Sequence, residues 1–372
     1  MTKDSSPGEG EGSRSLLFTG FPGFIGARLL PRVLELKPES RAVCLVQEKF
    51  VDAAREAADD LEHSHPHVRG RIELVTGDIT VKGLGIPAKL ARDLCRSLAE
   101  AYHLAAVYDL AVRRDVGRLI NVEGTKNVLD FLGEVPHFDR LHYVSTAYVS
   151  GAARGTFRET DLDVGQGFKN HYEETKFQAE VEVARSSVPH TIYRPGIVVG
   201  DSRTGETGKF DGPYFLLRVM EKLPSPGIFM RVGLGFGTVN IVPVDFVVEA
   251  LASLSASPLS AGKTYHLCDP QPHAPGELAE MFAAAIGKRF VQVPVPLRVA
   301  RAFFSPKPVQ RFFGMPAEAL DYFDDPVRHD TAQASEDLGD LGIECPRLED
   351  YMPRLVEFYQ AHKEKVRREA MI

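Results

Sequence analysis

The chain has 372 residues, of which 44% are hydrophobic and 26% are charged, and its formal net charge is -7. This composition is ordinary for a globular protein with a substantial core. The acidic balance argues against a nucleic-acid-binding protein, which normally carries a basic surface. The 4 cysteines lie far apart, without the paired spacing of zinc sites or disulfide frameworks. We therefore expect a cytoplasmic protein with no metal site.

Residues 1–14 are polar and rich in glycine and serine. They lack the apolar core of a signal peptide, so we expect a flexible tail. No stretch of the sequence reaches the roughly 18–20 apolar residues that a transmembrane helix needs, so no membrane-spanning segment is expected.

From Ser15 onward, short apolar runs alternate with longer amphipathic ones. The pattern predicts strands and helices in strict alternation, with strands at 15–20, 41–47, 71–80, 99–106 and 140–151 and helices at 23–36, 51–63, 87–99 and 120–134. Such alternation is typical of βαβ units. The predicted fold class is therefore α/β, with a Rossmann-type, doubly wound parallel sheet.

After Gly151 the rhythm changes. A loop leads into further elements, which we predict as a helix at 171–187, a strand at 190–200, a polar loop and helix at 201–227, a strand and helix at 237–256, and a strand at 263–269. From residue 273 the remainder reads as mostly helical. We predict one large domain and a smaller, mostly helical C-terminal lobe, the domain over 15–200 with 237–270 returning to it, and the lobe over 201–236 and 271–372.

The first turn, "TGFPGFIG" at 19–26, begins at Thr19 and contains three glycines spaced three apart, Gly20, Gly23 and Gly26. In a strand-to-helix turn, the first glycine permits the sharp turn and the second permits the close approach of a pyrophosphate. The third allows the helix to pack closely against the strand. The expected phosphate donors are the amides of Phe24 and Ile25 at the helix N-terminus. Pro22 has no amide hydrogen, but it precedes these donors. Phe21 departs from the usual pattern and could help to shape a substrate entrance.

The end of the second strand bears on the choice of dinucleotide. An acid there would bind the ribose 2′-hydroxyl and select NAD. The residue in that place is Gln47, although an acid, Glu48, is next to it. Arg28 and Lys49 are near enough in sequence to reach a 2′-phosphate, although ordinary solvated charge explains them nearly as well. We predict NADP (NADPH) rather than NAD as the cofactor.

Two more strand ends point toward the same crevice. Asp78 and Ile79 could flank the adenine, and the small residues after the fourth strand would let the cofactor lie against the sheet, namely Leu104, Ala105 and Ala106. Simple strand termination is the alternative explanation.

The strongest constellation is "YVSTAY" followed by "NHYEETK". Tyr172 and Lys176 are four apart on a predicted helix and so share a face. A lysine ammonium beside a tyrosine hydroxyl lowers the pKa of the tyrosine and makes it a competent proton donor. Ser145 and Thr146 end a preceding strand and could hold a substrate oxygen.

Together these motifs resemble the extended short-chain dehydrogenase/reductase family over roughly residues 15–265. The resemblance rests on an ordered series of motifs, TGxxGxxG at 19–26, DI at 78–79, HLAA at 103–106, NVEGT at 121–125, VSTAYV at 144–149, YxxTK at 172–176 and YRPGIVVG at 193–200. It implies that the large domain binds NAD(P) and that the C-terminal lobe binds substrate.

The resemblance also implies roles for individual residues. Tyr172 would be the general acid/base, and Lys176 would lower its pKa and bind the nicotinamide ribose. Thr146 matches the substrate-polarising position, with Ser145 beside it, and Asn121 would support the geometry of the active site.

Within that family, "HYVSTAYVSG" and "NHYEETKFQAE" are most similar to the reductase domains of fatty acyl-CoA reductases and carrier-protein thioester reductases. This implies reduction of a lipophilic carbonyl or acyl thioester, carried by coenzyme A or an acyl carrier protein. Pro195 and Gly196 would lie beside the nicotinamide carboxamide. A homodimer through two helices, one of them carrying Tyr172, is also implied.

Other functions stay open. A sugar-nucleotide epimerase or dehydratase, or a hydroxysteroid-type dehydrogenase, would share the tyrosine and lysine, and a non-catalytic NADP-sensing protein would share the cofactor site. The segment 293–315 interleaves phenylalanines with arginines and a lysine, which favours a lipophilic substrate. It could form an apolar substrate wall, pack within the lobe, or lie at a membrane interface.

Overall fold

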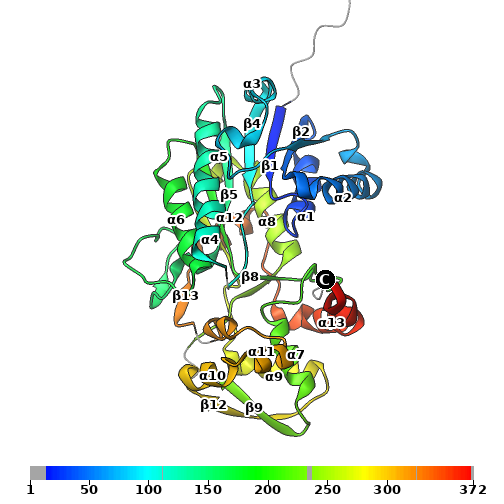
Figure 1. The fold of residues 1–372 in the computed structure, drawn as a ribbon, viewed down its shortest axis with the longest axis vertical. Coiled ribbons are helices and arrows are strands. Elements are labelled where there is room, and N and C mark those ends of the chain that lie inside the picture. Colours follow the sequence, from blue (N-terminus) through cyan, green and yellow to red (C-terminus); the bar gives the residue numbers. More distant parts are fainter. Residues whose placement is uncertain (1–13, 111, 233–236, 324, 370–372) are drawn as a thin grey trace, which may run out of the picture.

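The computed structural model describes residues 14–110, 112–232, 237–323 and 325–369. Within these residues, seven parallel strands form one sheet in the order β11-β7-β5-β4-β1-β2-β3. Strands β1, β2, β4 and β5 of this sheet are labelled in Figure 1. The strands are β1 (Arg14–Thr19), β2 (Ser40–Val46), β3 (Ile72–Thr76), β4 (Leu98–His103), β5 (Arg140–Val144), β7 (His190–Pro195) and β11 (Thr264–Leu267). This confirms the predicted Rossmann-type α/β fold.

Helices cover both faces of the sheet. Alternate residues of β1 point to opposite faces, as the two-residue period of a strand requires: Leu16 and Phe18 join one buried cluster, and Leu17 joins another. The first cluster contains α1 (Gly26–Leu36), α2 (Val51–Ser64) and α8 (Val244–Ala256), and the second contains α3 (Ala88–Ser97), α5 (Gly124–Gly133) and α6 (His171–Arg185). Both faces are therefore buried, which explains why the central strands read as continuous apolar runs.

The strand predicted over 190–200 is divided at Gly196. After β7, the chain leaves the large sheet and forms β8 (Ile197–Val199), which pairs with β10 (Ile241–Pro243). The Gly196 amide still donates to the Leu267 carbonyl at 3.1 Å. A Cβ at Gly196 would lie 2.8 Å from Asn240 Oδ1, so the division depends on a residue without a side chain.

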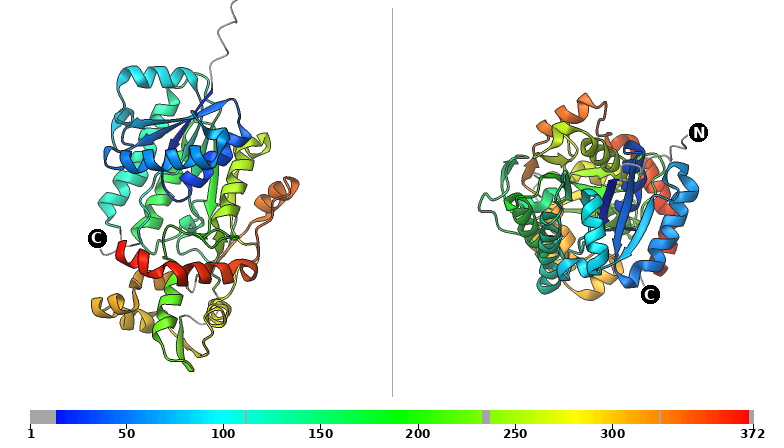
Figure 2. Two further views of the ribbon diagram at one scale, coloured as in Figure 1. Left: turned by 90° about the vertical axis from the view of Figure 1, so that its right-hand side faces the viewer. Right: turned by 90° about the horizontal axis from the view of Figure 1, so that it is seen from above.

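The C-terminal lobe has a hydrophobic cluster of its own. It contains helices and a parallel two-stranded sheet, namely α7 (Tyr214–Lys222), α9 (Pro275–Ala285), α10 (Leu297–Phe304), α11 (Lys307–Phe313), β9 (Gly227–Val232) and β12 (Phe290–Val295). Neither β9 nor β12 is predicted by the pattern of the sequence. Helix α13 (Leu348–Glu369) runs between the lobe and the large domain (Figure 2).

Part of the C-terminal chain returns to the large domain. Strand β13 (Val327–His329) pairs with β6 (Gly155–Phe157), and α12 (Ala332–Asp340) packs against α8 and β11. Ala334 and Leu338 of α12 belong to the core of the large sheet. These residues fall in the range 271–372 that was assigned to the lobe, and the domain boundaries stay a prediction.

Short helices complete the fold, namely η1 (Glu48–Phe50), η2 (Pro66–Val68), η3 (Lys82–Gly85), α4 (Arg114–Gly117), the π-helical η4 (Arg118–Glu123), η5 (Ala147–Ser150), η6 (Pro258–Ser260) and η7 (Ala317–Tyr322). Among the described helices, none combines the length and apolar character that crossing a bilayer requires.

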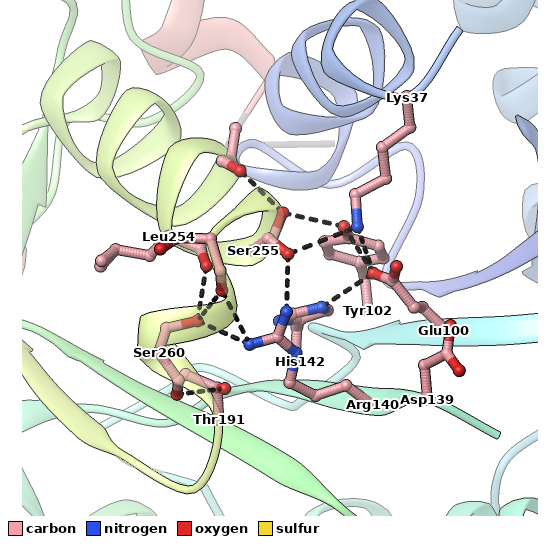
Figure 3. Close-up of polar contacts among 12 residues, drawn as sticks. Lys37, Glu100, Tyr102, Asp139, Arg140, His142, Thr191, Leu254, Ser255 and Ser260 are labelled. Atoms are coloured by element: carbon pink, nitrogen blue, oxygen red, sulfur yellow. Dashed lines mark hydrogen bonds and ion pairs between the residues drawn. The ribbon is translucent and has the colours of Figure 1, made fainter. Parts of the chain in front are cut away.

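A buried polar cluster lies near the amino ends of β4 and β5, beside α1 and α8 (Figure 3). Glu100 pairs with Lys37, and its Oε2 lies 3.0 Å from His142 Nε2. Tyr102 donates to Ser255 Oγ at 2.9 Å. The cluster thus joins two strands to two helices near the amino ends of the strands. Thr19 and Thr146 lie at the opposite, carboxyl ends.

Candidate active site

The glycine loop forms a tight turn between β1 and α1. Gly20 has φ +87, and a Cβ there would lie 2.8 Å from the Ala105 amide nitrogen. Cβ atoms at Gly23 and Gly26 would each lie 2.7 Å from the Gly20 carbonyl oxygen. None of the three glycine positions has room for a side chain, and Gly20 has a backbone conformation that side chains disfavour.

The loop fits the pyrophosphate of a dinucleotide. Among the described residues, no hydrogen-bond acceptor is found for the amides of Phe24 and Ile25, which directly precede the 11-residue helix α1. Unpaired amides and the positive end of the helix dipole together favour an anion. Phe21 is only 4% exposed and packs in the core. It anchors the loop and does not line a substrate entrance.

The residues expected to meet the ribose 2′ position already have partners within the protein. The Arg28 guanidinium donates to Glu206 at 2.7 Å and lies 4.5 Å from the centroid of the Phe24 ring. The Gln47 amide donates to the Asp78 carboxylate at 2.8 Å. Lys49 is exposed and lies over the Phe50 ring. The residue directly after β2 is thus an amide, Gln47, and the exposed Glu48 follows it at the start of η1.

Hydrogen bonds within the protein fix the residues that follow β3 and β4. Asp78 also accepts hydrogen bonds from Thr80, and the Ile79 carbonyl accepts one from Asn127 at 2.7 Å. The Thr19 hydroxyl accepts a hydrogen bond from the Ala105 amide at 3.2 Å and lies 2.7 Å from His103 Nδ1. Leu104, Ala105 and Ala106 follow β4 directly and are partly or fully exposed. These contacts fix the loop after β4 against the glycine turn.

His103 links the loop to helix α5. Its Nε2 lies 3.0 Å from the Thr125 hydroxyl, while Nδ1 faces Thr19. Burial lowers the pKa of His103 to about 3, so the imidazole is neutral. Because a neutral imidazole donates from one nitrogen and accepts at the other, it orders both threonine hydroxyls.

Tyr172 and Thr146 come together at the carboxyl end of β5. Both are buried, with 8% and 5% of their surface exposed. Burial raises the pKa of Tyr172, and a hydrogen bond between its side chain and Thr146 opposes the rise. Thr146 also caps η5 by accepting the Tyr148 amide at 3.3 Å. The Tyr108 ring meets the Tyr172 ring edge-on at 5.2 Å.

Lys176 lies one turn further along α6 and is 3% exposed. Its Nζ donates to the Tyr143 hydroxyl at 3.1 Å and to the Val144 carbonyl at 2.9 Å. Burial lowers the pKa of Lys176 to about 8, and the nearby Glu180 carboxylate opposes the change. The ammonium thus lies against β5, and the described contacts do not include one with the Tyr172 hydroxyl.

Ser145 has a different partner from Thr146. Its hydroxyl donates to Glu180, whose carboxylate also accepts from the buried Arg194 guanidinium at 2.9 Å from Nε. The structure therefore brings Thr146 to Tyr172 and directs Ser145 to a buried ion pair. Pro195 and Gly196 follow Arg194 at the end of β7.

Asn121 joins two segments beside the site. Its Oδ1 accepts the Val107 amide at 2.9 Å, and its Nδ2 donates to the Thr175 hydroxyl of α6 at 3.0 Å. It lies in η4, a π-helical turn, and such turns are frequent at functional sites. Asn121 thus fixes the loop after β4 relative to the helix that carries Tyr172.

Sequence reasoning missed the residues that support this site, Tyr108, Thr125, Tyr143 and Thr175. Tyr143 lies in the apolar strand "RLHYV" and looks like core, and Thr125 and Thr175 look like ordinary helical residues. Thr125 lies in the NVEGT motif and Thr175 lies in the YxxTK motif. The recurrence of threonine in these motifs was the signal that could have identified both residues.

The C-terminal lobe contains an apolar cavity of about 110 Å³. Its lining comes from α7, β9, α10, α11 and η7 and includes Leu216, Phe229, Met230, Phe303, Phe304 and Phe313. Phe304 is buried, whereas Phe303 and Phe312 are 45% and 59% exposed. The segment 293–315 therefore both packs within the lobe and lines a cavity.

Comparison with known proteins places this geometry in a family. A fatty acyl-CoA reductase, wat, from Drosophila melanogaster is 27% identical over 274 residues, which are 64% of this chain and 53% of that protein. The nonribosomal peptide synthetase asaC from Aspergillus flavus is 27% identical over 284 residues, which are 72% of this chain and 27% of that protein. The chain spans about half or less of the length of these relatives.

Solved structures show the same fold. The terminal R domain of the myxalamid PKS-NRPS pathway superimposes with a TM-score of 0.80 and 26% identity, covering 97% of this chain and 94% of that one. A dTDP-glucose 4,6-dehydratase from Streptomyces venezuelae superimposes with a TM-score of 0.65 at 20% identity, covering 94% of this chain and 98% of that one, which shows the fold alone. Residues 18–251, which run from β1 through most of α8, match the NAD-binding family described as "Male sterility protein". The chain belongs to that family.

Proposed function

We propose that this chain is an NADPH-dependent reductase of lipophilic acyl thioesters or related carbonyls. The observation that carries the proposal is the Tyr172–Thr146 pair at the carboxyl end of β5, beside a buried lysine and a glycine turn with free amides. Its relatives include a fatty acyl-CoA reductase and nonribosomal peptide synthetases.

In the proposed mechanism, a nicotinamide held by the residues of this site would supply the hydride that the carbonyl carbon receives. Thr146 and Tyr172 donate hydrogen bonds to the carbonyl oxygen, which stabilises the charge that develops there. Tyr172 then transfers its proton to that oxygen. The Lys176 charge favours the phenolate that remains. For a thioester, the carbon–sulfur bond then breaks and the proton passes from that oxygen to the sulfur. The products are an aldehyde and a free thiol, with one hydride and one proton consumed.

Other residues of the chain hold and align the cofactor. The Phe24 and Ile25 amides would bind the pyrophosphate, Asp78 and Ile79 would flank the adenine, and Leu104 to Ala106 would contact the adenosine. Pro195 and Gly196 would lie beside the nicotinamide carboxamide, and Lys176 would bind its ribose. Asn121 would hold α6, and with it Tyr172, in a fixed position relative to the bound cofactor, which favours the reactive geometry.

The substrate class is supported by the apolar cavity in the C-terminal lobe. A cavity lined mainly by leucine, methionine and phenylalanine side chains favours an alkyl chain over a polar group. Coenzyme A and an acyl carrier protein are both suitable carriers of such a chain as a thioester.

The preference for NADP is supported by the end of β2. Gln47 replaces the acid that would bind a 2′-hydroxyl and repel a 2′-phosphate. Arg28 and Lys49 are the cations in this region, and Arg28 would exchange Glu206 for the phosphate. We also infer a cytoplasmic location, supported by four cysteines that are all unpaired in the described chain. A homodimer remains a prediction.

The test is a panel of substrates assayed for NADPH and NADH oxidation, containing long-chain acyl-CoAs, fatty aldehydes, ketosteroids and sugar nucleotides. We expect turnover of acyl-CoAs or aldehydes, with NADPH preferred. Turnover of sugar nucleotides alone would contradict the proposal and favour an epimerase or dehydratase. Cofactor binding without turnover of any class would favour a sensor.

A further inference from the structure

Two pieces of the C-terminal chain contact the catalytic region although they are far from it in sequence. One is Tyr322, at the end of η7. The other is the segment 325–329, here called the strap, which includes β13 and pairs with β6. Figure 1 shows β13 between the large sheet and the C-terminal lobe.

The strap and Tyr322 hold the first turn of α6. The Lys169 ammonium lies 2.6 Å from Asp325 Oδ2, with side chains 12% and 3% exposed. Asn170 Nδ2 donates to the Tyr322 hydroxyl at 2.7 Å, and Asn170 Oδ1 caps α6 by accepting the Glu173 amide at 3.0 Å. These contacts lie within three residues of Tyr172 along the chain.

The same two pieces hold the segment that follows Thr146. His329 Nε2 lies 3.0 Å from the Ala147 carbonyl oxygen and 3.1 Å from the Ser150 hydroxyl. The Tyr322 ring meets the Tyr148 ring edge-on at 4.8 Å. Since η5 begins directly after Thr146, the strap contacts the supports of both residues that bind the substrate oxygen in the proposed function.

The charges around Lys169 are unusual for a contact that only adds stability. Glu173 is completely buried, and within the described chain its Oε1 has no hydrogen-bond partner; the Lys169 ammonium is 3.9 Å from it. Two buried carboxylates thus share one ammonium. Because burying charges costs nearly as much as pairing them gains, such a cluster contributes little net stability.

We propose that Asp325 and Lys169 are positioning residues that set the orientation of Tyr172 relative to Thr146. The strap thereby couples the placement of the C-terminal lobe to the catalytic pair. This inference rests on the proposed function for its kinetic readout and on the structure alone for its spectroscopic readout.

The test compares Asp325→Asn and Lys169→Met with a matched control, Asp337→Asn. Asp337 of α12 also pairs with a lysine distant in sequence, Lys263 at 2.7 Å, and it accepts a hydrogen bond from Tyr265 of β11 at 2.6 Å. These partners belong to neither α6 nor η5. We expect Asp325→Asn and Lys169→Met each to lower kcat by about 10- to 100-fold with the KM for NADPH unchanged, as small misplacements of reacting groups do. The double variant should be no slower than the worse single variant, and Lys169→Arg should recover part of the rate.

A second readout does not require turnover. In protein labelled with 3-fluorotyrosine, the ¹⁹F resonance of Tyr172 is assigned by its loss in Tyr172→Phe. We expect it to shift in Asp325→Asn and not in Asp337→Asn. An unchanged resonance and unchanged kcat in the folded strap variant, or equal effects in the control, would overturn the proposal. Absence of thioester turnover by the wild type would overturn the proposed function, and the resonance would still decide the role of the strap.

Discussion

At the scale of single residues, neighbours in sequence make different contacts in the structure. Ser145 and Thr146 are adjacent, yet Thr146 meets Tyr172 and Ser145 meets Glu180. The sequence predicted the Tyr172–Lys176 face from helical spacing, but spacing does not show that the Lys176 ammonium lies against Tyr143. The direction of a side chain depends on partners from distant strands, which no local pattern contains.

The lysine leads to a prediction about pH. Because burial lowers the pKa of Lys176 to about 8, the ammonium loses its charge as the pH rises through this value. We expect kcat to fall above about pH 8, since the neutral amine no longer favours the Tyr172 phenolate. In Lys176→Arg the charge persists, so the fall should disappear at a lower overall rate. A wild-type kcat that stays level to pH 10 would contradict this role.

At the scale of elements, the prediction was most successful where period and motif agreed. The alternation of strands and helices before Gly151 predicted the large sheet, and the glycine spacing predicted a turn from β1 into α1. The strands β9 and β12 were missed because most of their side chains are only partly buried, so they lack the buried apolar runs of the central strands, and β12 contains a proline that a strand pattern disfavours. The break at Gly196 was missed because its cause, Asn240, is distant in sequence.

The substitution Gly20→Ala adds one methyl group and tests whether the glycine turn binds the cofactor. Gly20→Ala places a Cβ 2.8 Å from the Ala105 nitrogen at φ +87, so we expect a loss of stability of about 1–3 kcal/mol. Displacement of the turn should also weaken NADPH binding. The control is Gly70→Ala, where φ is +68 and no described atom lies within 4 Å of the added Cβ. Equal NADPH affinity in both variants would argue against a cofactor role for the turn.

At the scale of the whole molecule, the buried cluster of Figure 3 ties two helices to the sheet on the side away from the catalytic residues. Burial alone would raise the pKa of Glu100, but its contacts with His142 and Lys37 outweigh burial and hold it at about 2. Burial lowers the pKa of His142 to about 4. In both cases the folded state binds protons less readily than the unfolded chain, so stability is lost as the pH falls.

This cluster predicts the course of acid unfolding. The contribution of His142 should be lost as pH falls from about 6.5 to about 4, and that of Glu100 from about 4.5 to about 2. We expect Glu100→Gln to reduce the free energy of unfolding at pH 7 by about 3–5 kcal/mol, because Lys37 stays buried without its partner. It should also flatten the dependence below pH 4.5. Urea titrations over a pH series measure both effects, and an unchanged slope in the variant would contradict the account.

The central claim is that Tyr172 donates the proton in an NADPH-dependent reduction. The most direct measurement compares wild type and Tyr172→Phe for NADPH oxidation with a long-chain acyl-CoA, alongside NADPH binding by fluorescence. We expect turnover to fall by at least about 100-fold, while NADPH binding stays near its wild-type strength because the glycine turn is untouched. Turnover at the wild-type rate in the phenylalanine variant would contradict the claim.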